Sequence, residues 1–221
     1  MMPALRSDAV TKVLRRLRAA GEAEDGPAKL RVRTRESELG QKIYGRERAD
    51  LYGRAPIAIT EEVGELLYML ALWRRARTIV EFGASLGVST IYLAAAVRDA
   101  GSGRVTTTEL EPEKARLASA NLAEAGLADL VDLRVGDALG TLCDLAGPVD
   151  LLFLDGWNDL YLPVLELVAP HLAPGALVAA DMSKDDPHHV LYREYVRDPA
   201  RRYFTIELPL DDGVVLSVRL A

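Results

Sequence analysis

The chain of 221 residues has few histidines and almost no cysteine: it contains three histidines and one cysteine, Cys143. A single cysteine excludes an internal disulfide and a cluster of thiolate metal ligands, and it suits a reducing cytoplasm. No apolar stretch approaches the roughly 20 residues that a membrane-spanning helix requires. The N-terminus also lacks a signal-peptide core, because Lys12, Arg15 and Arg16 interrupt its apolar positions. We therefore expect a cytoplasmic protein without a membrane partner.

Basic residues are in the minority, with 27 Lys and Arg against 33 Asp and Glu, and they are unevenly distributed. Residues 1–55 carry 13 basic and 8 acidic residues, a net charge of +5, whereas residues 56–221 carry 14 and 25, a net charge of −11. An acidic surface does not bind a phosphate backbone, so no nucleic-acid partner is expected. The same boundary divides a predicted helical extension, residues 1–55, from one α/β domain, residues 56–221.

The N-terminal extension is predicted to contain two helical regions without catalytic residues. Residues 8–20 place their apolar side chains on one face, and Gly21, Gly26 and Pro27 are expected to end this helix. A second, heavily charged helical region is expected from about Leu30 to Leu51. A charged helical appendage is one interpretation of this region.

The segment Thr78 to Thr90, TIVEFGASLGVST, organises the remainder of the pattern. Ile79 to Phe82 form the apolar, β-branched run that is typical of a buried parallel strand. Apolar residues at helical spacing begin at Leu86, so the chain passes from strand to helix through a turn with Gly83 and Gly87. Such a turn lets a ligand approach the backbone and the free N–H groups of the new helix.

The spacing of this turn separates three classes of ligand site. The dinucleotide pattern GxGxxG is not matched, because the five residues from Gly83 are Gly-Ala-Ser-Leu-Gly. The serine hydrolase pattern GxSxG is matched literally, with Ser85 as the nucleophile and His188 or His189 as the base. However, only one strand precedes the turn and no oxyanion segment is present. A third class of ligand site, considered below with the remaining strands, has an acidic residue two positions before the first glycine. Glu81 occupies that position here.

Polar residues follow four further predicted strands, over residues 105–108, 131–135, 149–154 and 176–180. Glu109 ends the first of these, the turn Gly136 to Ala138 ends the second, and Asp155 and Asp181 end the last two. Because the carboxyl ends of parallel strands meet at one edge of a sheet, these residues are expected to lie together. Two final strands, over residues 204–208 and 214–218, are expected to form an antiparallel hairpin.

These segments together resemble the class I S-adenosylmethionine-dependent O-methyltransferases of the catechol and caffeoyl-CoA type, including their bacterial branch. The segments TIVEFGASLGVST, ITEEVGELLYML and TTELEPEKARLASANLAEAGL carry the resemblance, which covers about residues 56–221. It implies a doubly wound, Rossmann-like α/β fold whose seven-stranded sheet is mostly parallel, with the last strand antiparallel. It also implies that the N-terminal helices cover the active site or build a homodimer.

The resemblance further implies S-adenosylmethionine as the cofactor and a small phenolic or catechol-like acceptor. The cofactor-binding residues that it implies are Thr60, Glu81, Gly83, Ala84, Ser85, Ser89, Glu109, Gly136, Asp137, Ala138 and Asp155. A carboxylate at the end of the second strand suits the ribose hydroxyls, a role for which Glu111 competes with Glu109. Thr60 and Asp137 equally suit helix N-caps. Trp157, Tyr161 and Tyr192 suggest an aromatic pocket for the acceptor.

Metal-dependent members of this family hold a divalent cation with carboxylates at the ends of the fourth and fifth strands. Asp155 and Asp181 occupy these positions, but Met182 replaces an asparagine and Asn158 replaces a lysine. Because a thioether is a poor ligand for Mg²⁺, we predict at most a weak metal site. The candidate catalytic residues are Asp155, Asp181, Lys184 and His188. Two alternatives stay open: a serine hydrolase that uses Ser85, and a protein that binds S-adenosylmethionine without turnover.

Overall fold

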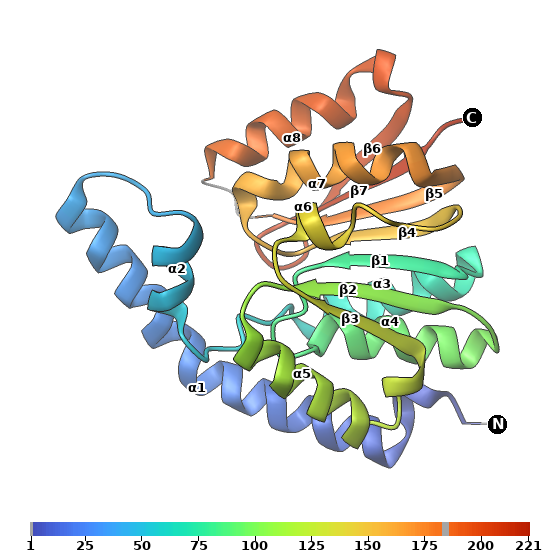
Figure 1. Cartoon of the computed structure of the whole chain (residues 1–221), viewed down its shortest axis with the longest axis horizontal. Coiled ribbons are helices and arrows are strands. Elements are labelled where there is room, and N and C mark those ends of the chain that lie inside the picture. The colour runs from blue at the N-terminus through green and yellow to red at the C-terminus, as the bar shows by residue number, and fades with distance from the viewer. Residues whose placement is uncertain (1, 183–185) are drawn as a thin grey trace.

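The computed structural model of the protein describes residues 2–182 and 186–221. Seven strands form one sheet in the order β3-β2-β1-β4-β5-β7-β6 (Figure 1). Strands β1 to β5 pair in parallel, and β7 runs antiparallel to both β5 and β6. The predicted sheet is therefore confirmed. The strands are β1 (Thr78–Phe82), β2 (Arg104–Glu109), β3 (Val131–Val135), β4 (Val149–Leu154), β5 (Leu172–Asp181), β6 (Tyr203–Leu208) and β7 (Val214–Arg219).

Helices cover both faces of this sheet because its central strands are apolar on both sides. In β4, Leu151 and Phe153 belong to one buried cluster, and Leu152 and Leu154 belong to the other. The first cluster packs against α1 (Asp8–Leu39), α3 (Glu61–Arg74), α4 (Val88–Ala100) and α5 (Pro112–Glu124). The second packs against α6 (Ala138–Thr141), α7 (Tyr161–Val168) and α8 (Pro187–Arg197). Short 3₁₀ helices cover Ala4–Arg6, Ala128–Leu130, Asn158–Leu160, Ala169–His171 and Pro199–Arg201.

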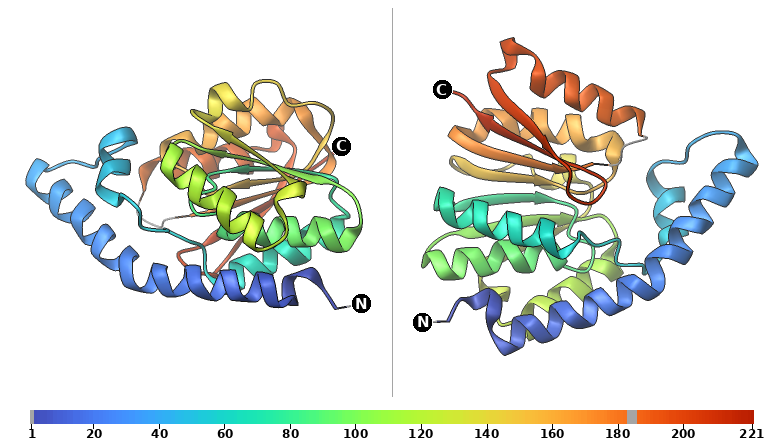
Figure 2. Two further views of the ribbon diagram at one scale, coloured as in Figure 1. Left: turned by 60° about the horizontal axis from the view of Figure 1, so that its bottom comes forward. Right: turned by 180° about the vertical axis from the view of Figure 1, so that it is seen from behind.

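The first helix is much longer than predicted. It continues through Gly21, Gly26 and Pro27 and ends only at Gly40, whose φ of +67° is left-handed. The prediction that the first three of these residues end the helix is therefore wrong. Figure 2 shows α1 curving along the domain and extending beyond it.

Tertiary packing explains why α1 continues past Pro27. Proline removes one backbone donor from the helix, a local cost of roughly 3 kcal/mol. Beyond it, however, Ala28 and Val32 are buried against Tyr52, so the second half of α1 has a hydrophobic partner. That partner is α2 (Gly45–Tyr52), the only helical part of the second predicted region that is separate from α1. Burial of this kind outweighs intrinsic propensity.

The second half of α1 and α2 form a projection at the carboxyl ends of the strands, which we call the cap (residues 26–55) (Figure 1). The first half of α1 contributes Val10, Val13 and Leu17 to the main core. One helix thus joins the cap to the body of the domain. The predicted domain boundary after residue 55 stays a prediction.

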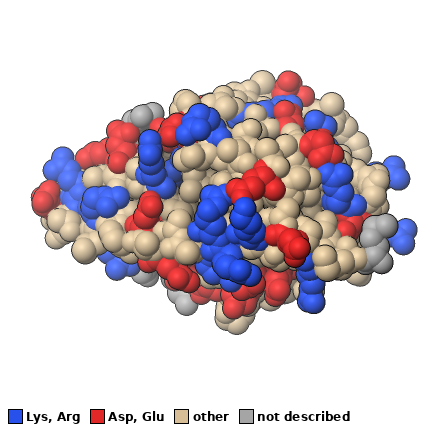
Figure 3. Space-filling view, turned by 90° about the horizontal axis from the view of Figure 1, so that it is seen from below, with Lys and Arg blue, Asp and Glu red and all other residues tan. Residues whose placement is uncertain are grey.

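The basic residues of α1 are paired with acidic ones where α1 crosses α5. Figure 3 views this side and shows Lys and Arg side chains gathered beside acidic side chains. Lys12 Nζ lies 3.1 Å from Glu124, and Arg16 Nη2 lies 2.6 Å from the same carboxylate. Among the described residues, no helix is both long and apolar enough to cross a membrane.

Candidate active site

A cavity of about 500 Å³ lies between the cap and the carboxyl ends of the strands. Most of the predicted site residues line it: Gly83, Ser85, Glu109, Gly136, Asp137, Ala138, Asp155 and Asp181. Ala84 and Ser89 line a smaller recess of about 10 Å³ that also touches Ser85 and Asp155. The parallel strands therefore bring residues from the ends of five strands to one crevice, as the topology requires.

The turn after β1 lies directly against the backbone of the neighbouring strands. The N–H of Ala84 donates to the carbonyl oxygen of Thr108 at 2.9 Å. Gly83 has a φ of +99°, and a Cβ atom there would lie 2.5 Å from the carbonyl oxygen of Asp155. Only glycine is compatible with both the backbone angle and the space. The floor of the cavity is consequently bare backbone.

The carboxylate of Glu109 is fixed beside this turn by two backbone donors. Its Oε2 accepts the N–H of Ser85 at 2.7 Å, and its Oε1 accepts the N–H of Glu111 at 2.9 Å. Burial raises the pKa of Glu109, while the two N–H groups and nearby Lys114 oppose that shift. Glu111 precedes α5 as its N-cap residue and also lines the cavity. Glu109 is thus the carboxylate that the turn itself positions.

Glu81 lies beneath the cavity floor and is not among the lining residues. Its side chain is 0% exposed, and its Oε2 accepts the hydroxyls of Thr90 and Thr107, each at 2.5 Å. Burial raises the pKa of Glu81 because the charged form loses its hydration. The structure therefore gives Glu81 a position under the glycine turn, between α4 and β2.

A glutamine at position 81 should raise stability at neutral pH. The folded state holds the proton of Glu81 more tightly than the unfolded state does. The stabilisation that the protonated Glu81 contributes is therefore complete below the pKa of the unfolded state and is lost as the pH rises through the pKa of the folded state. Glu81→Gln keeps a side-chain oxygen that can accept the hydroxyls of Thr90 and Thr107, but the amide cannot ionise. Urea unfolding at several pH values should show a variant advantage at pH 7 that shrinks below about pH 4. The exposed Glu113→Gln is the control, and a pH-independent difference at position 81 would contradict this assignment.

Asp155 and Asp181 are partly buried carboxyl groups at the ends of β4 and β5. Burial, followed by the charge of Asp181, raises the pKa of Asp155 well above its usual range. Burial, followed by repulsion from Asp211 and Asp212, raises the pKa of Asp181 to about 7. Both carboxyl groups therefore keep their protons to higher pH than exposed aspartates do.

The donor atoms at this edge do not complete a site for a hard cation such as Mg²⁺. Met182 is 1% exposed and belongs to the apolar cluster under α7 and α8, so it supplies a buried thioether in place of an oxygen ligand. Within residues 2–182 and 186–221, no three His, Cys, Asp or Glu side chains are grouped so as to hold a metal ion. Of the three predicted ligand positions, Asp155 and Asp181 carry oxygen donors and Met182 does not.

Several predicted residues lie away from the cavity. Thr60 is the N-cap of α3 and accepts the N–H of Val63 at 3.5 Å; it is not among the lining residues. The ring of His188 lies 3.0 Å from Asp186 and packs edge-on against Tyr44. Lys184 lies outside the described residues. Of the three aromatic residues, Trp157 and Tyr161 line the cavity, whereas Tyr192 is buried in the core.

The hydrolase alternative gains no support from the environment of Ser85. Its φ of +46° resembles a strained elbow. However, its hydroxyl donates to the carbonyl oxygen of Pro56, and the ring of His189 packs on Tyr161 on the other face of the sheet. Ser85 therefore contributes its backbone N–H to Glu109 and ties the turn to the segment before α3.

Sequence reasoning missed several residues of the cavity wall. Lys114 is 9% exposed, and its Nζ donates to the carbonyl oxygen of Ala55 at 3.0 Å. Arg48 and Tyr52 reach the cavity from α2, and Asp211 reaches it from the β6–β7 loop. The sequence offered little signal, because charged residues in a helix or a turn usually face solvent. Tertiary packing brings them to the site: the cap places Arg48 and Tyr52, α5 places Lys114, and the β6–β7 loop places Asp211.

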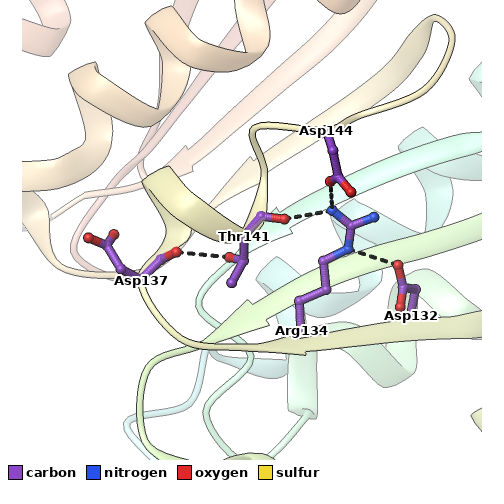
Figure 4. A network of polar contacts seen from close by, with 5 residues as sticks. All are labelled: Asp132, Arg134, Asp137, Thr141 and Asp144. Carbon is purple, nitrogen blue, oxygen red and sulfur yellow. Dashed lines mark hydrogen bonds and ion pairs between the residues drawn. The ribbon is translucent and has the colours of Figure 1, made fainter.

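Arg134 anchors the turn that forms one wall of the cavity. Its Nε bonds Asp132 at 2.9 Å, and its Nη1 bonds the carbonyl oxygen of Thr141 at 2.6 Å and Asp144 at 2.5 Å (Figure 4). The hydroxyl of Thr141 in turn donates to the carbonyl oxygen of Asp137 at 3.0 Å. Asp137 also caps α6. The network therefore fixes residues 136–138 against β3.

Known methyltransferases are similar to this chain in sequence. Residues 80–181 match a family described as a methyltransferase domain. The chain is 40% identical over 127 residues to a catechol O-methyltransferase of Mycobacterium tuberculosis, which covers 57% of this chain and 56% of that protein. It is 34% identical over 191 residues to a relative in Mycolicibacterium smegmatis that bears the name "Putative O-methyltransferase", covering 79% of this chain and 88% of the relative. The chain thus spans little more than half the length of the catechol enzyme.

Solved structures share the fold as well. An O-methyltransferase of Streptomyces achromogenes involved in tomaymycin synthesis, solved in complex with SAM, has a TM-score of 0.65 and 30% identity. The match covers 75% of this chain and 82% of that one. The strand order, the glycine turn after β1 and the acid after β2 define a class I methyltransferase fold. With the relatives, they place the chain in a more particular group. It belongs to the S-adenosylmethionine-dependent O-methyltransferase family.

Proposed function

We propose that the protein transfers the methyl group of S-adenosylmethionine to a hydroxyl group of a small phenolic or catechol-like acceptor. The observation that carries this proposal is the convergence of Gly83, Glu109, Asp155 and Asp181 on one cavity beneath the cap. Relatives named as catechol O-methyltransferases and a similar structure in complex with SAM support it. A separate base or nucleophile on Ser85 has no part in this reaction.

The strand ends suit the parts of the cofactor. Bare backbone at Gly83 permits close approach, and the fixed Glu109 carboxylate offers lone pairs to ribose hydroxyls. The turn from Gly136 to Ala138 supplies a wall beyond the ribose. When bound, S-adenosylmethionine supplies an activated methyl group on a positively charged sulfur. The carboxyl groups of Asp155 and Asp181 give this end of the cavity the opposite charge.

The carboxyl pair provides the proton acceptor. Methyl transfer forms an oxygen–carbon bond as the sulfur–carbon bond breaks, and the acceptor hydroxyl releases one proton. Asp181, with its pKa raised to about 7, is partly ionised near neutral pH and takes that proton. The raised pKa of Asp155 favours its protonated form beside that base. Lys184 and His188, the other candidate bases, stay predictions.

Isothermal titration calorimetry with S-adenosylhomocysteine tests cofactor binding. We expect a micromolar dissociation constant, about −8 kcal/mol, and no competition from NAD or NADP. The absence of heat with either S-adenosylmethionine or S-adenosylhomocysteine would overturn the proposal. Binding without product would instead favour a non-catalytic binding protein. A homodimer and a cytoplasmic location also stay predictions, the first of which size-exclusion chromatography with light scattering would decide.

Removal of the Glu109 carboxylate should weaken cofactor binding. Glu109→Ala loses charge-assisted hydrogen bonds to ribose and also releases the N–H of Ser85, so we expect a loss of roughly 1–3 kcal/mol. Calorimetry with S-adenosylhomocysteine measures it. Glu113→Ala, an exposed carboxylate bonded to Arg116, is the matched control. Unchanged affinity in Glu109→Ala, with a loss in Glu111→Ala, would transfer the ribose role to Glu111.

A further inference from the structure

The cavity wall is divided by charge between its two sides. The cap contributes Lys29, Arg33, Lys42 and Arg48 with a single carboxylate, that of Glu36. Lys42 Nζ lies 3.0 Å from Glu36 and balances it. The strand ends and their loops contribute an excess of acids, among them Asp155, Asp181 and Asp211. The acidic side suits a cationic methyl donor, so the basic side faces the remaining volume of the cavity.

Arg48 is the cation most clearly built into this wall. It extends from α2 over the rings of Tyr52 and Trp157, with its guanidinium carbon 5.7 Å and 5.8 Å from their centroids. Its Nη1 makes a long contact of 3.4 Å to the carbonyl oxygen of Ile43, and its charge also acts on the carboxylate of Glu36. Its Nε is buried without a hydrogen-bond partner among the described residues. A buried N–H without an acceptor is destabilising, and an anionic ligand would supply the missing acceptor.

The aromatic residues beside Arg48 form a stacked pair. Tyr52 and Trp157 have ring centroids 5.8 Å apart and planes inclined by 29°. Tyr52 comes from the cap, whereas Trp157 follows β4, close in sequence to Asp155. A planar acceptor packed against this stacked pair would share the cavity with Arg48 and with the carboxyl groups of Asp155 and Asp181. The geometry therefore combines an anion-binding group with a site for an aromatic ring.

We propose that the acceptor is a hydroxylated aromatic acid whose carboxylate is bound by Arg48 of the cap. The inference rests on the proposed function, because it names the acceptor class of the same site. A guanidinium binds a carboxylate through two parallel N–H groups, which would include the unpaired Nε. A neutral catechol lacks this contact and should bind more weakly.

Equilibrium binding distinguishes the two kinds of acceptor without requiring turnover. The protein saturated with S-adenosylhomocysteine would be titrated with 3,4-dihydroxybenzoate and with its uncharged amide, 3,4-dihydroxybenzamide. We expect the acid to bind at least about tenfold more tightly than the amide, as one charged hydrogen-bonded contact allows. In Arg48→Met, which keeps the apolar stem, the ratio should fall to near one while the affinity for the amide changes little.

Arg54→Met is the matched control, because Arg54 is exposed, pairs with Glu113 and does not line the cavity. It should keep the wild-type ratio, and Arg48→Lys should retain part of it. Equal affinity for acid and amide, or a ratio that survives in Arg48→Met, overturns the inference, as does failure of the acid to bind. Absence of methylated product while the acid still binds through Arg48 contradicts the proposed function alone.

Discussion

Asp181→Asn is expected to reduce turnover by about 10²- to 10⁴-fold, because it removes the group that accepts the proton of the hydroxyl. Asparagine has nearly the same shape, and the main-chain carbonyl that accepts the hydroxyl of Tyr161 at 2.6 Å is unaffected. Wild-type turnover should rise with pH through about 7, as Asp181 ionises. The variant should lose this dependence while it keeps its affinity for S-adenosylhomocysteine. Initial rates between pH 5 and 9 would measure both effects.

Two controls test whether Asp181 acts as a base, rather than as a metal ligand or only through its negative charge. Asp212→Asn removes an acid from the same end of the cavity, so it should lower the pKa of Asp181 and move the rise in turnover to lower pH. Wild-type turnover should persist at least in part in EDTA, because Met182 leaves the cation site incomplete. Abolition by EDTA with full recovery in Mg²⁺ would contradict proton removal by the carboxyl pair alone.

Gly83→Ala should destabilise the fold by roughly 2–4 kcal/mol and abolish measurable cofactor binding. The added methyl group would meet the carbonyl oxygen of Asp155 at 2.5 Å, in a backbone conformation with a φ of +99° that alanine adopts only under strain. Relief requires the turn to move away from β4, which displaces Ser85 and the carboxylate that its N–H holds. Urea unfolding and calorimetry with S-adenosylhomocysteine would measure the two consequences.

Gly101→Ala isolates the backbone effect. Gly101 has a φ of +78°, but a Cβ atom there would meet nothing within 4 Å. Its loss of stability should therefore be only about 1 kcal/mol, with unchanged cofactor affinity. If the two alanine variants were equally stable, the close approach of Gly83 to Asp155 would have no energetic importance.

Much of the sheet was predictable because buried parallel strands have continuous apolar sequences. The runs 79–82 and 149–154 correspond closely to β1 and β4. Prediction failed where tertiary contacts override local preference. Pro27 should end a helix, but the contact between Val32 and Tyr52 extends α1 past it. Likewise β5 begins at Leu172 rather than Ala176, since Leu172 pairs with Val149 in β4 despite Pro174.

The candidate site was predictable only on the sheet side. Glu109, Asp155 and Asp181 follow strands directly, so their positions follow from topology. Arg48 lies on α2 and Lys114 on α5, and their place in the cavity wall depends on how these helices pack around the strand ends. No local pattern marks them. For Glu81 the local pattern was misleading. Its place in the motif predicted a cofactor contact, but its side chain lies beneath the cavity floor, bonded to the hydroxyls of Thr90 and Thr107.

The most direct test of methyl transfer is a mass measurement with S-adenosylmethionine that carries a deuterated methyl group. The protein would be incubated with this donor and 3,4-dihydroxybenzoate, with catechol as a second acceptor and Asp181→Asn as the inactive reference. We predict that the labelled methyl group appears on an acceptor oxygen, with one S-adenosylhomocysteine formed for each product. Binding of the donor without labelled product from either acceptor would contradict the account.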